Sequence, residues 1–255
     1  EASSIDATGG KIVLLGDHIS NSGKLTANGV TGGGEILVGG DWQGSNADLY
    51  PHASRVTLTE TSDISAQATQ QGNGGKIVLW SGMDKTNGVT SVAGRLNAES
   101  SGSQSAGGKI ETSGKSLVIA EGTDVKTKGG EWLLDPVNIT IDSTLAGTIS
   151  SSLNSGSVTI STTSPSTNNP STGGFESGTD GDITVNSAIS KNSGPDSTLT
   201  LKAHRHIKVA SGASITSEFN KLNLVLWANQ DGAADGRIEI GNSGTTLTNI
   251  TTNGG

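Results

Sequence analysis

The chain has 255 residues, of which 31% are hydrophobic and 3% aromatic, and its formal net charge is −8. Its 16 basic and 24 acidic residues are spread evenly, so no basic patch marks a nucleic-acid partner, and no apolar run reaches membrane-spanning length. Cysteine is absent, which excludes disulfides, thiolate metal sites and thiol catalysis.

One short phrase recurs five times in the first half of the chain. Each copy is a pair of glycines, one charged residue and then an apolar strand, at 9–14, 33–38, 74–79, 107–110 and 129–134. Repetition of strand phrases without the spacing of an amphipathic helix predicts a β-solenoid. We therefore expect an all-β fold, a right-handed parallel β-helix with almost no helix. The low apolar content suits it, because each turn buries only a narrow stripe of Val, Ile and Leu.

The pattern predicts two consecutive segments of this β-helix. Residues 1–135 hold the glycine phrases, with shorter strands predicted between them at 56–59, 94–98, 116–119 and 123–126. Pro136 cannot donate to a ladder and marks the boundary. Residues 136–255 continue with a different phrase, and their Ser/Thr/Pro-rich stretch at 162–181 is predicted to be an exposed excursion. A disordered chain could share this composition, but its strands would not recur so regularly.

Four blocks of the first half carry a family resemblance. They read GGEILVGGDWQG at 33–44, GNGGKIVLWS at 72–81, GGKIETSGK at 107–115 and GEWLLDPVNITI at 130–141. In order and spacing they resemble the filamentous haemagglutinin family of large exoproteins, and the match is looser after residue 141. The resemblance implies a right-handed parallel β-helix that a Gram-negative bacterium exports through an outer-membrane two-partner secretion transporter, with a role in adhesion and virulence. The amino-terminal secretion domain of that family is missing, so we expect an internal fragment.

Carboxylates are the first candidates for catalysis, because β-helices also include polysaccharide lyases and hydrolases, which need converging acids. The candidate acids fall singly and at turns; they are Asp41, Asp48, Asp63, Asp84 and Asp135. We therefore predict no catalytic residue and no enzyme, with the carbohydrate-active enzyme kept as an alternative.

Two other motifs suggest ion binding and are better explained without it. Asp180-Gly181-Asp182 lacks the further ligands of a calcium loop and is predicted to be a turn. Alternation along a strand would place His204 and His206 on one outward face with Arg205 opposite, and a third metal ligand is not evident. The sequence therefore predicts no metal site and no cofactor.

Aromatic residues are the better candidates for ligand binding. Trp42 lies between Asp41 and Gln43 in a glycine-rich segment, with Tyr50 nearby, and an exposed Trp ring can stack on a sugar. Asp41, Trp42 and Tyr50 are our candidate ligand-binding residues. The other three Trp residues lie at strong strands, where packing is the ordinary explanation; they are Trp80, Trp132 and Trp227.

The predicted function is structural and adhesive. We expect a non-catalytic segment of a secreted bacterial surface protein that attaches to host cells, glycans or other bacteria. A passive stalk that presents a distal toxin or receptor-binding tip is the alternative. Asn138 and Asn249 begin Asn-Ile-Thr sequons and are candidate glycosylation sites. The expected partners are the secretion transporter and a host receptor or glycan, and no nucleic acid.

Overall fold

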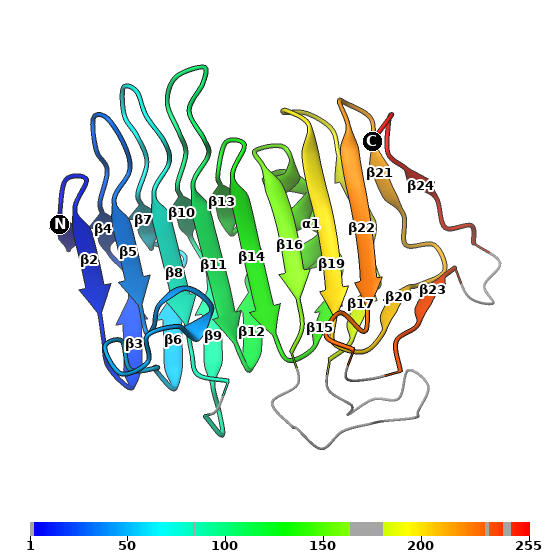
Figure 1. The fold of residues 1–255 in the computed structure, drawn as a ribbon, viewed down its shortest axis with the longest axis horizontal. Helices are drawn as coiled ribbons and strands as arrows, with labels where there is room; N and C mark the ends of the chain where they lie inside the picture. Colours follow the sequence, from blue (N-terminus) through cyan, green and yellow to red (C-terminus); the bar gives the residue numbers. More distant parts are fainter. Residues whose placement is uncertain (1–2, 84, 164–180, 233–234, 242–245) are drawn as a thin grey trace.

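The structure is a computed structural model that describes residues 3–83, 85–163, 181–232, 235–241 and 246–255. Within these residues the fold is almost entirely β, and every pair of hydrogen-bonded strands in its ladders is parallel (Figure 1). The predicted all-β class is thereby confirmed. The excursion predicted at 162–181 falls mostly on residues 164–180, which lie outside the described residues.

One long sheet runs through the whole structure, in the order β2-β5-β8-β11-β14-β16-β19-β22. Its strands are β2 (Lys11–Leu14), β5 (Glu35–Val38), β8 (Lys76–Trp80), β11 (Lys109–Gly114), β14 (Glu131–Pro136), β16 (Ser157–Ser161), β19 (Ser197–Ala203) and β22 (Leu222–Ala228).

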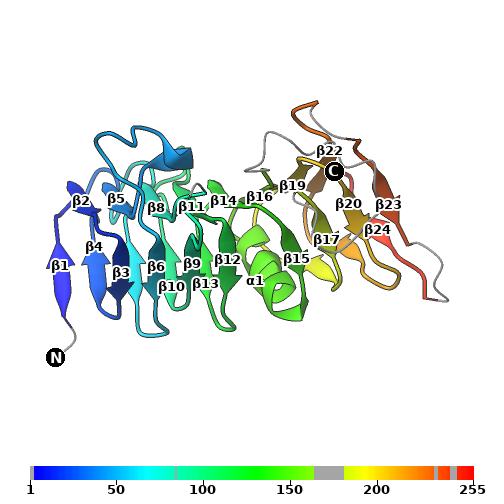
Figure 2. The same cartoon turned by 90° about the horizontal axis from the view of Figure 1, so that it is seen from below.

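Two further faces are each divided into two sheets. The second face holds β3 (His18–Asn21), β6 (Arg55–Leu58), β9 (Val89–Val92) and β12 (Ser116–Ile119), then β15 (Ile139–Ile141), β17 (Ile183–Val185), β20 (Ile207–Val209) and β23 (Ile238–Ile240). The third holds β1 (Ser4–Asp6), β4 (Lys24–Thr26), β7 (Asp63–Ser65), β10 (Arg95–Asn97) and β13 (Asp124–Lys126), then β18 (Ile189–Lys191), β21 (Ile215–Ser217) and β24 (Ile250–Thr251). From β2 onward the chain visits the long, second and third faces in turn, so each turn lies beside the preceding one (Figure 2).

An α-helix interrupts the third face. Helix α1 (Ser143–Leu153) packs against β13 and β18 and takes the position of a strand in its turn (Figure 2). Its buried Leu145, Ile149 and Leu153 are four residues apart, which puts them on one face of a helix. Asp142 caps its start, because the carboxylate accepts the Leu145 N–H at 2.9 Å. Our prediction that no three-turn helical spacing exists is wrong here, since Ser, Thr and Gly between the apolar residues obscure the pattern.

The glycine phrase brings successive turns into close contact. A Cβ at Gly34 would lie 2.0 Å from the Gly10 carbonyl oxygen, and one at Gly130 would lie 1.9 Å from that of Gly108. Only glycine fits there. The charged residues that follow the glycines are in register across the long sheet, from Lys11 through Glu35, Lys76 and Lys109 to Glu131.

The apolar side chains form two clusters. The larger cluster fills the interior between the three faces and includes Trp132, whose Nε1–H donates to the Thr112 hydroxyl at 3.0 Å. The smaller cluster lies on the outward face of the long sheet and consists of Leu37, Val78 and Trp80. No described helix is both long and apolar enough to cross a membrane.

Candidate functional site

A loop covers part of the outward face of the long sheet. Residues 40–53, here the cover loop, connect β5 to β6 and fold over the sheet at β8 and β11 (Figures 1 and 2). Its short 3-10 turn, η1 (Trp42–Gly44), contacts both strands. The strands β5, β8, β11 and β14, here the covered region, are buried on both of their faces, and the loop contacts two of them, β8 and β11.

The predicted ligand residue Asp41 fastens the start of this loop. Its Oδ1 accepts the Trp42 N–H at 2.7 Å and lies 3.1 Å from Lys76 Nζ, and its Oδ2 accepts the Asn46 amide at 2.9 Å. Burial alone would raise the pKa of this carboxyl, but the hydrogen bonds and the lysine outweigh it and hold the pKa below its usual value. Asp41 therefore stays ionised at neutral pH.

Trp42 and Tyr50, the other two predicted ligand residues, pack on the outward apolar cluster. Lys109 Nζ lies 5.5 Å from the centroid of the Trp42 ring, and Lys11 Nζ lies 4.7 Å from that of Tyr50, with its ammonium donating to the Tyr50 hydroxyl at 2.9 Å. The structure thus brings Asp41, Trp42 and Tyr50 together on one loop. Both rings are only partly exposed, because they hold the loop against the sheet.

Two carboxylates on the outward face of the long sheet are buried; Asp135 is one of the predicted candidate acids, whereas Glu111 was missed. Glu111 is 0% exposed, and its carboxylate accepts the Gln43 N–H at 2.8 Å and the Ser113 hydroxyl at 2.8 Å. Asp135 is 7% exposed, and its Oδ1 has no hydrogen-bond partner in the described structure. Burial raises the pKa of Glu111 to about 7 and that of Asp135 to about 7. Hydrogen bonds to Glu111 oppose this shift, and the charges of Asp135 and Asp41 add to it.

The expectation that the candidate acids stand singly at turns is therefore wrong for two of them. Asp135 lies inside β14, and Asp63 lies at the start of β7. Strand alternation does place Glu111 and Asp135 outward, but outward positions usually face water. Only the tertiary position of the cover loop would have indicated the burial of Glu111. Asp48 is exposed in the loop, and Asp84 lies outside the described residues.

The basic cluster in the second half is structural. His204, Arg205 and His206 are all buried, in the turn between β19 and β20. The predicted outward strand face is wrong, because Arg205 turns inward and its Nε–H donates to Asp182 Oδ1 at 2.8 Å. His204 Nδ1 lies 2.7 Å from an Asp231 carboxylate oxygen. Across the described residues, no three His, Asp or Glu side chains form a group that could hold a metal ion.

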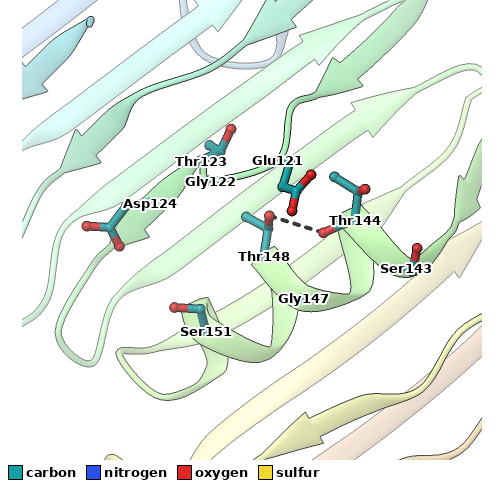
Figure 3. A pocket seen from close by; sticks show the side chains of 9 residues that line it. All are labelled: Glu121, Gly122, Thr123, Asp124, Ser143, Thr144, Gly147, Thr148 and Ser151. Carbon is teal, nitrogen blue, oxygen red and sulfur yellow. Dashed lines mark hydrogen bonds between the residues drawn. The ribbon is translucent and has the colours of Figure 1, made fainter. Parts of the chain in front are cut away.

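A polar groove lies beside helix α1. It has a volume of about 560 Å³, and residues 121–124 form one wall while α1 forms the other. Figure 3 shows its side chains, which are hydroxyls from Thr and Ser together with the carboxylates of Glu121 and Asp124. Asp124 is already engaged, 3.1 Å from Lys126 Nζ. The groove offers hydrogen-bonding groups, but the described residues that line it include neither an aromatic platform nor a cation.

Among the described residues, the outward face of the second half is more exposed than that of the first. Strands β16, β19 and β22, here the open region, alternate between buried inward and more exposed outward residues. Trp227 is 49% exposed and Val225 is 41% exposed, both on the outward face of β22. Lys202 is the cross-strand partner of Trp227, and its Nζ lies 5.9 Å from the ring centroid.

The two predicted glycosylation residues are exposed, as a modification would require. Asn138 follows β14, and its side-chain oxygen accepts the Asp182 N–H at 2.9 Å. Asn249 precedes β24, and its backbone N–H donates to Ser214 Oγ at 3.2 Å. Modification at both sites stays a prediction.

Comparison with known proteins does not assign the chain to a family. No protein-family model matches the chain, and no curated protein matches it either.

Proposed function

We propose that the chain is a segment of a right-handed parallel β-helix from a secreted bacterial exoprotein of the filamentous haemagglutinin type. The support is the regular visit to three faces, the parallel ladders and the glycine phrase that lets turns stack. Parallel strands joined by crossovers are right-handed in nearly all known cases. Its role on this proposal is adhesive and non-catalytic, at the bacterial cell surface. An outer-membrane two-partner secretion transporter and a host receptor or glycan are its partners.

The observation that carries the adhesive role is the open region. Its outward positions hold mostly Ser, Thr and Asn from three strands in register, together with Lys202, Val225 and Trp227. A half-exposed Trp beside a lysine is an uncommon surface feature, because a large apolar ring is usually buried. The ring offers an apolar face to a sugar or a protein loop, and Lys202 forms no ion pair within the described residues.

A binding screen tests this proposal. The intact chain is applied to host cells, to bacterial cells and to a glycan array, in parallel with Trp227→Ala and with Val118→Ala as a control. Val118 is a similarly exposed apolar residue on β12 of another face. We expect binding by the wild type and by the control, and at least about tenfold weaker binding by Trp227→Ala, as for a central interface aromatic. Absence of binding by the wild type would favour the passive stalk.

One observation favours a second candidate, a carbohydrate-active enzyme. Acid–base pairs are recognised by environments that push two pKa values apart, and burial raises the pKa of Glu111 to about 7 while the pKa of nearby Asp41 is lowered. Glu111 is fully buried, so a substrate reaches it only if the cover loop moves. Release of reducing ends from polysaccharides by the wild type, and its loss in Glu111→Gln, would support this candidate.

A further inference from the structure

The cover loop is held to the long sheet at three polar points. Asp41 pairs with Lys76, the Tyr50 hydroxyl accepts from Lys11, and the Gln43 N–H donates to Glu111 at 2.8 Å. The first two points involve Lys76 and Lys11, which belong to the row of charged residues in register across the long sheet, here the charged row. The third reaches deeper, to a carboxylate that is 0% exposed. The state of Glu111 therefore bears directly on the closure of the loop.

The backbone at this third point is strained. Gln43 has φ 51° and Asn46 has φ 53°, both in the left-handed region that residues other than glycine adopt at a cost. The hydrogen bond from Gln43 to Glu111 holds the first of them in place. Because loss of this buried hydrogen bond would let the strained turn relax, the loop is expected to open at this point.

The two buried carboxyls have no cation beside them to balance their charge. Among the described residues, no lysine or arginine forms an ion pair with Glu111 or Asp135. Lys109 on β11 faces the Trp42 ring, and Lys76 on β8 is bonded to Asp41 and Glu35. The remaining ionisable groups on the elements around Glu111 are Asp41, Asp48, Tyr50 and His52 of the cover loop, Glu35 of β5, Lys11 of β2, and Glu131 and Asp135 of β14.

Two carboxyls in this position stay neutral while the loop is closed. Ionisation would place two negative charges at buried positions on adjacent strands, two residues apart in register. Burial raises the pKa of each to about 7, so both lose their protons just above neutral pH. Opening of the loop breaks the Gln43 contact, exposes Glu111 to water and relieves this cost. A rise in pH therefore favours the open form.

We propose that the cover loop is a pH-dependent clasp, closed while Glu111 and Asp135 carry protons and open when they ionise. Opening uncovers the outward apolar cluster of Leu37, Val78 and Trp80, together with the inner faces of Trp42 and Tyr50. The long sheet itself stays intact, because its interior cluster lies on the other side.

Hydrogen–deuterium exchange of the intact chain between pH 5.5 and 8.5 tests the clasp. After correction for intrinsic exchange rates, we expect peptides from the cover loop to exchange at least about tenfold faster at pH 8.5, with peptides from β16 and β19 unchanged. Tryptophan emission should move to longer wavelength over the same interval, because Trp42 and Trp80 enter water. An exchange rate in the loop that is independent of pH would overturn the proposal.

Matched variants identify the groups that titrate. The double variant Glu111→Gln with Asp135→Asn cannot ionise at either position, and the amide oxygen introduced by Glu111→Gln still accepts from the Gln43 N–H, so the loop should stay closed at pH 8.5. Glu121→Gln, the same change at an exposed acid, should behave like the wild type. Persistence of the pH response in the double variant, with its loss in His52→Asn, would assign the response to the imidazole and refute the proposal. If the double variant does not fold, the exchange of the wild-type loop decides alone.

Discussion

The covered and open regions belong to one continuous sheet, but their outward side chains differ in exposure. Outward positions in the covered region hold Leu37, Val78 and Trp80, all buried, whereas the open region presents Thr200, Val225 and Trp227. The cover loop buries outward side chains of the covered region, and the strand sequences differ to match. A strand that is buried on both faces has a continuous apolar sequence, as β8 does. A strand that is buried on one face alternates between apolar and polar residues, as β19 does.

Two tryptophans give the sharpest test of this contrast. Trp80 and Trp227 both point outward from the long sheet, but Trp80 is 4% exposed and Trp227 is 49% exposed. Trp80→Ala should lower the free energy of unfolding by about 3–4 kcal/mol, because it leaves a cavity under the loop. Trp227→Ala should lower it by less than about 1 kcal/mol. Urea denaturation followed by far-UV circular dichroism measures both. Equal losses would mean that the loop does not seal the covered region.

The second prediction concerns the pH dependence of stability, which we expect to arise from the two buried carboxyls of the covered region. The pKa of Glu111 is raised from 4.5 to about 7, so the folded state holds this proton more tightly than the unfolded state. Its stabilising contribution is full below about pH 4.5 and is lost as the pH rises through about 7, and the same sign holds for Asp135. We expect the free energy of unfolding to fall by about 2–3 kcal/mol for each of the two carboxyls between pH 5 and pH 8.

The control for this acidity is the variant that carries Glu111→Gln and Asp135→Asn. Its urea midpoint should be nearly constant over the same pH interval. A wild-type midpoint that rises from pH 5 to pH 8 would contradict the burial of the two carboxyls.

Two glycine positions, Gly75 between stacked turns and Gly147 in α1, should respond to the same substitution in opposite ways. A Cβ at Gly75 would lie 2.1 Å from the Gly34 carbonyl oxygen, while one at Gly147 in α1 meets nothing within 4 Å. Gly75→Ala should cost about 1–3 kcal/mol, because backbones of two turns must separate. Gly147→Ala should instead stabilise by up to about 1 kcal/mol, through helix propensity. Thermal denaturation of the two variants, whose substitution is identical, would show opposite shifts in Tm.

The sequence predicts the strands well and their surroundings less well. The glycine phrase correctly predicts strands such as β5, and alternation predicts strands such as β12, because turn chemistry and period are local properties. Helix α1 was missed because its apolar period is weak and it is stabilised by packing against β13 and β18. Glu111 was missed and the His204 turn was misjudged for a related reason. Their burial depends on segments far away in the sequence, whereas alternation predicts only which side of a strand a residue lies on.

The smallest expected effect concerns the charged row at the edge of the covered region. Glu35 lies between two lysines, 2.6 Å from Lys11 Nζ and also paired with Lys76, and this holds its pKa below the usual value despite partial burial. Glu35→Gln should cost about 1 kcal/mol at low salt, because partly exposed ion pairs contribute little. In 1 M sodium chloride the difference should shrink toward zero, since the Debye length falls to about 3 Å. Lys202→Gln in the open region, which breaks no ion pair among the described residues, should have no salt-dependent effect. A salt-insensitive loss in Glu35→Gln would mean that this carboxylate acts by packing the loop edge rather than by charge, and the covered region would then depend on apolar contact alone.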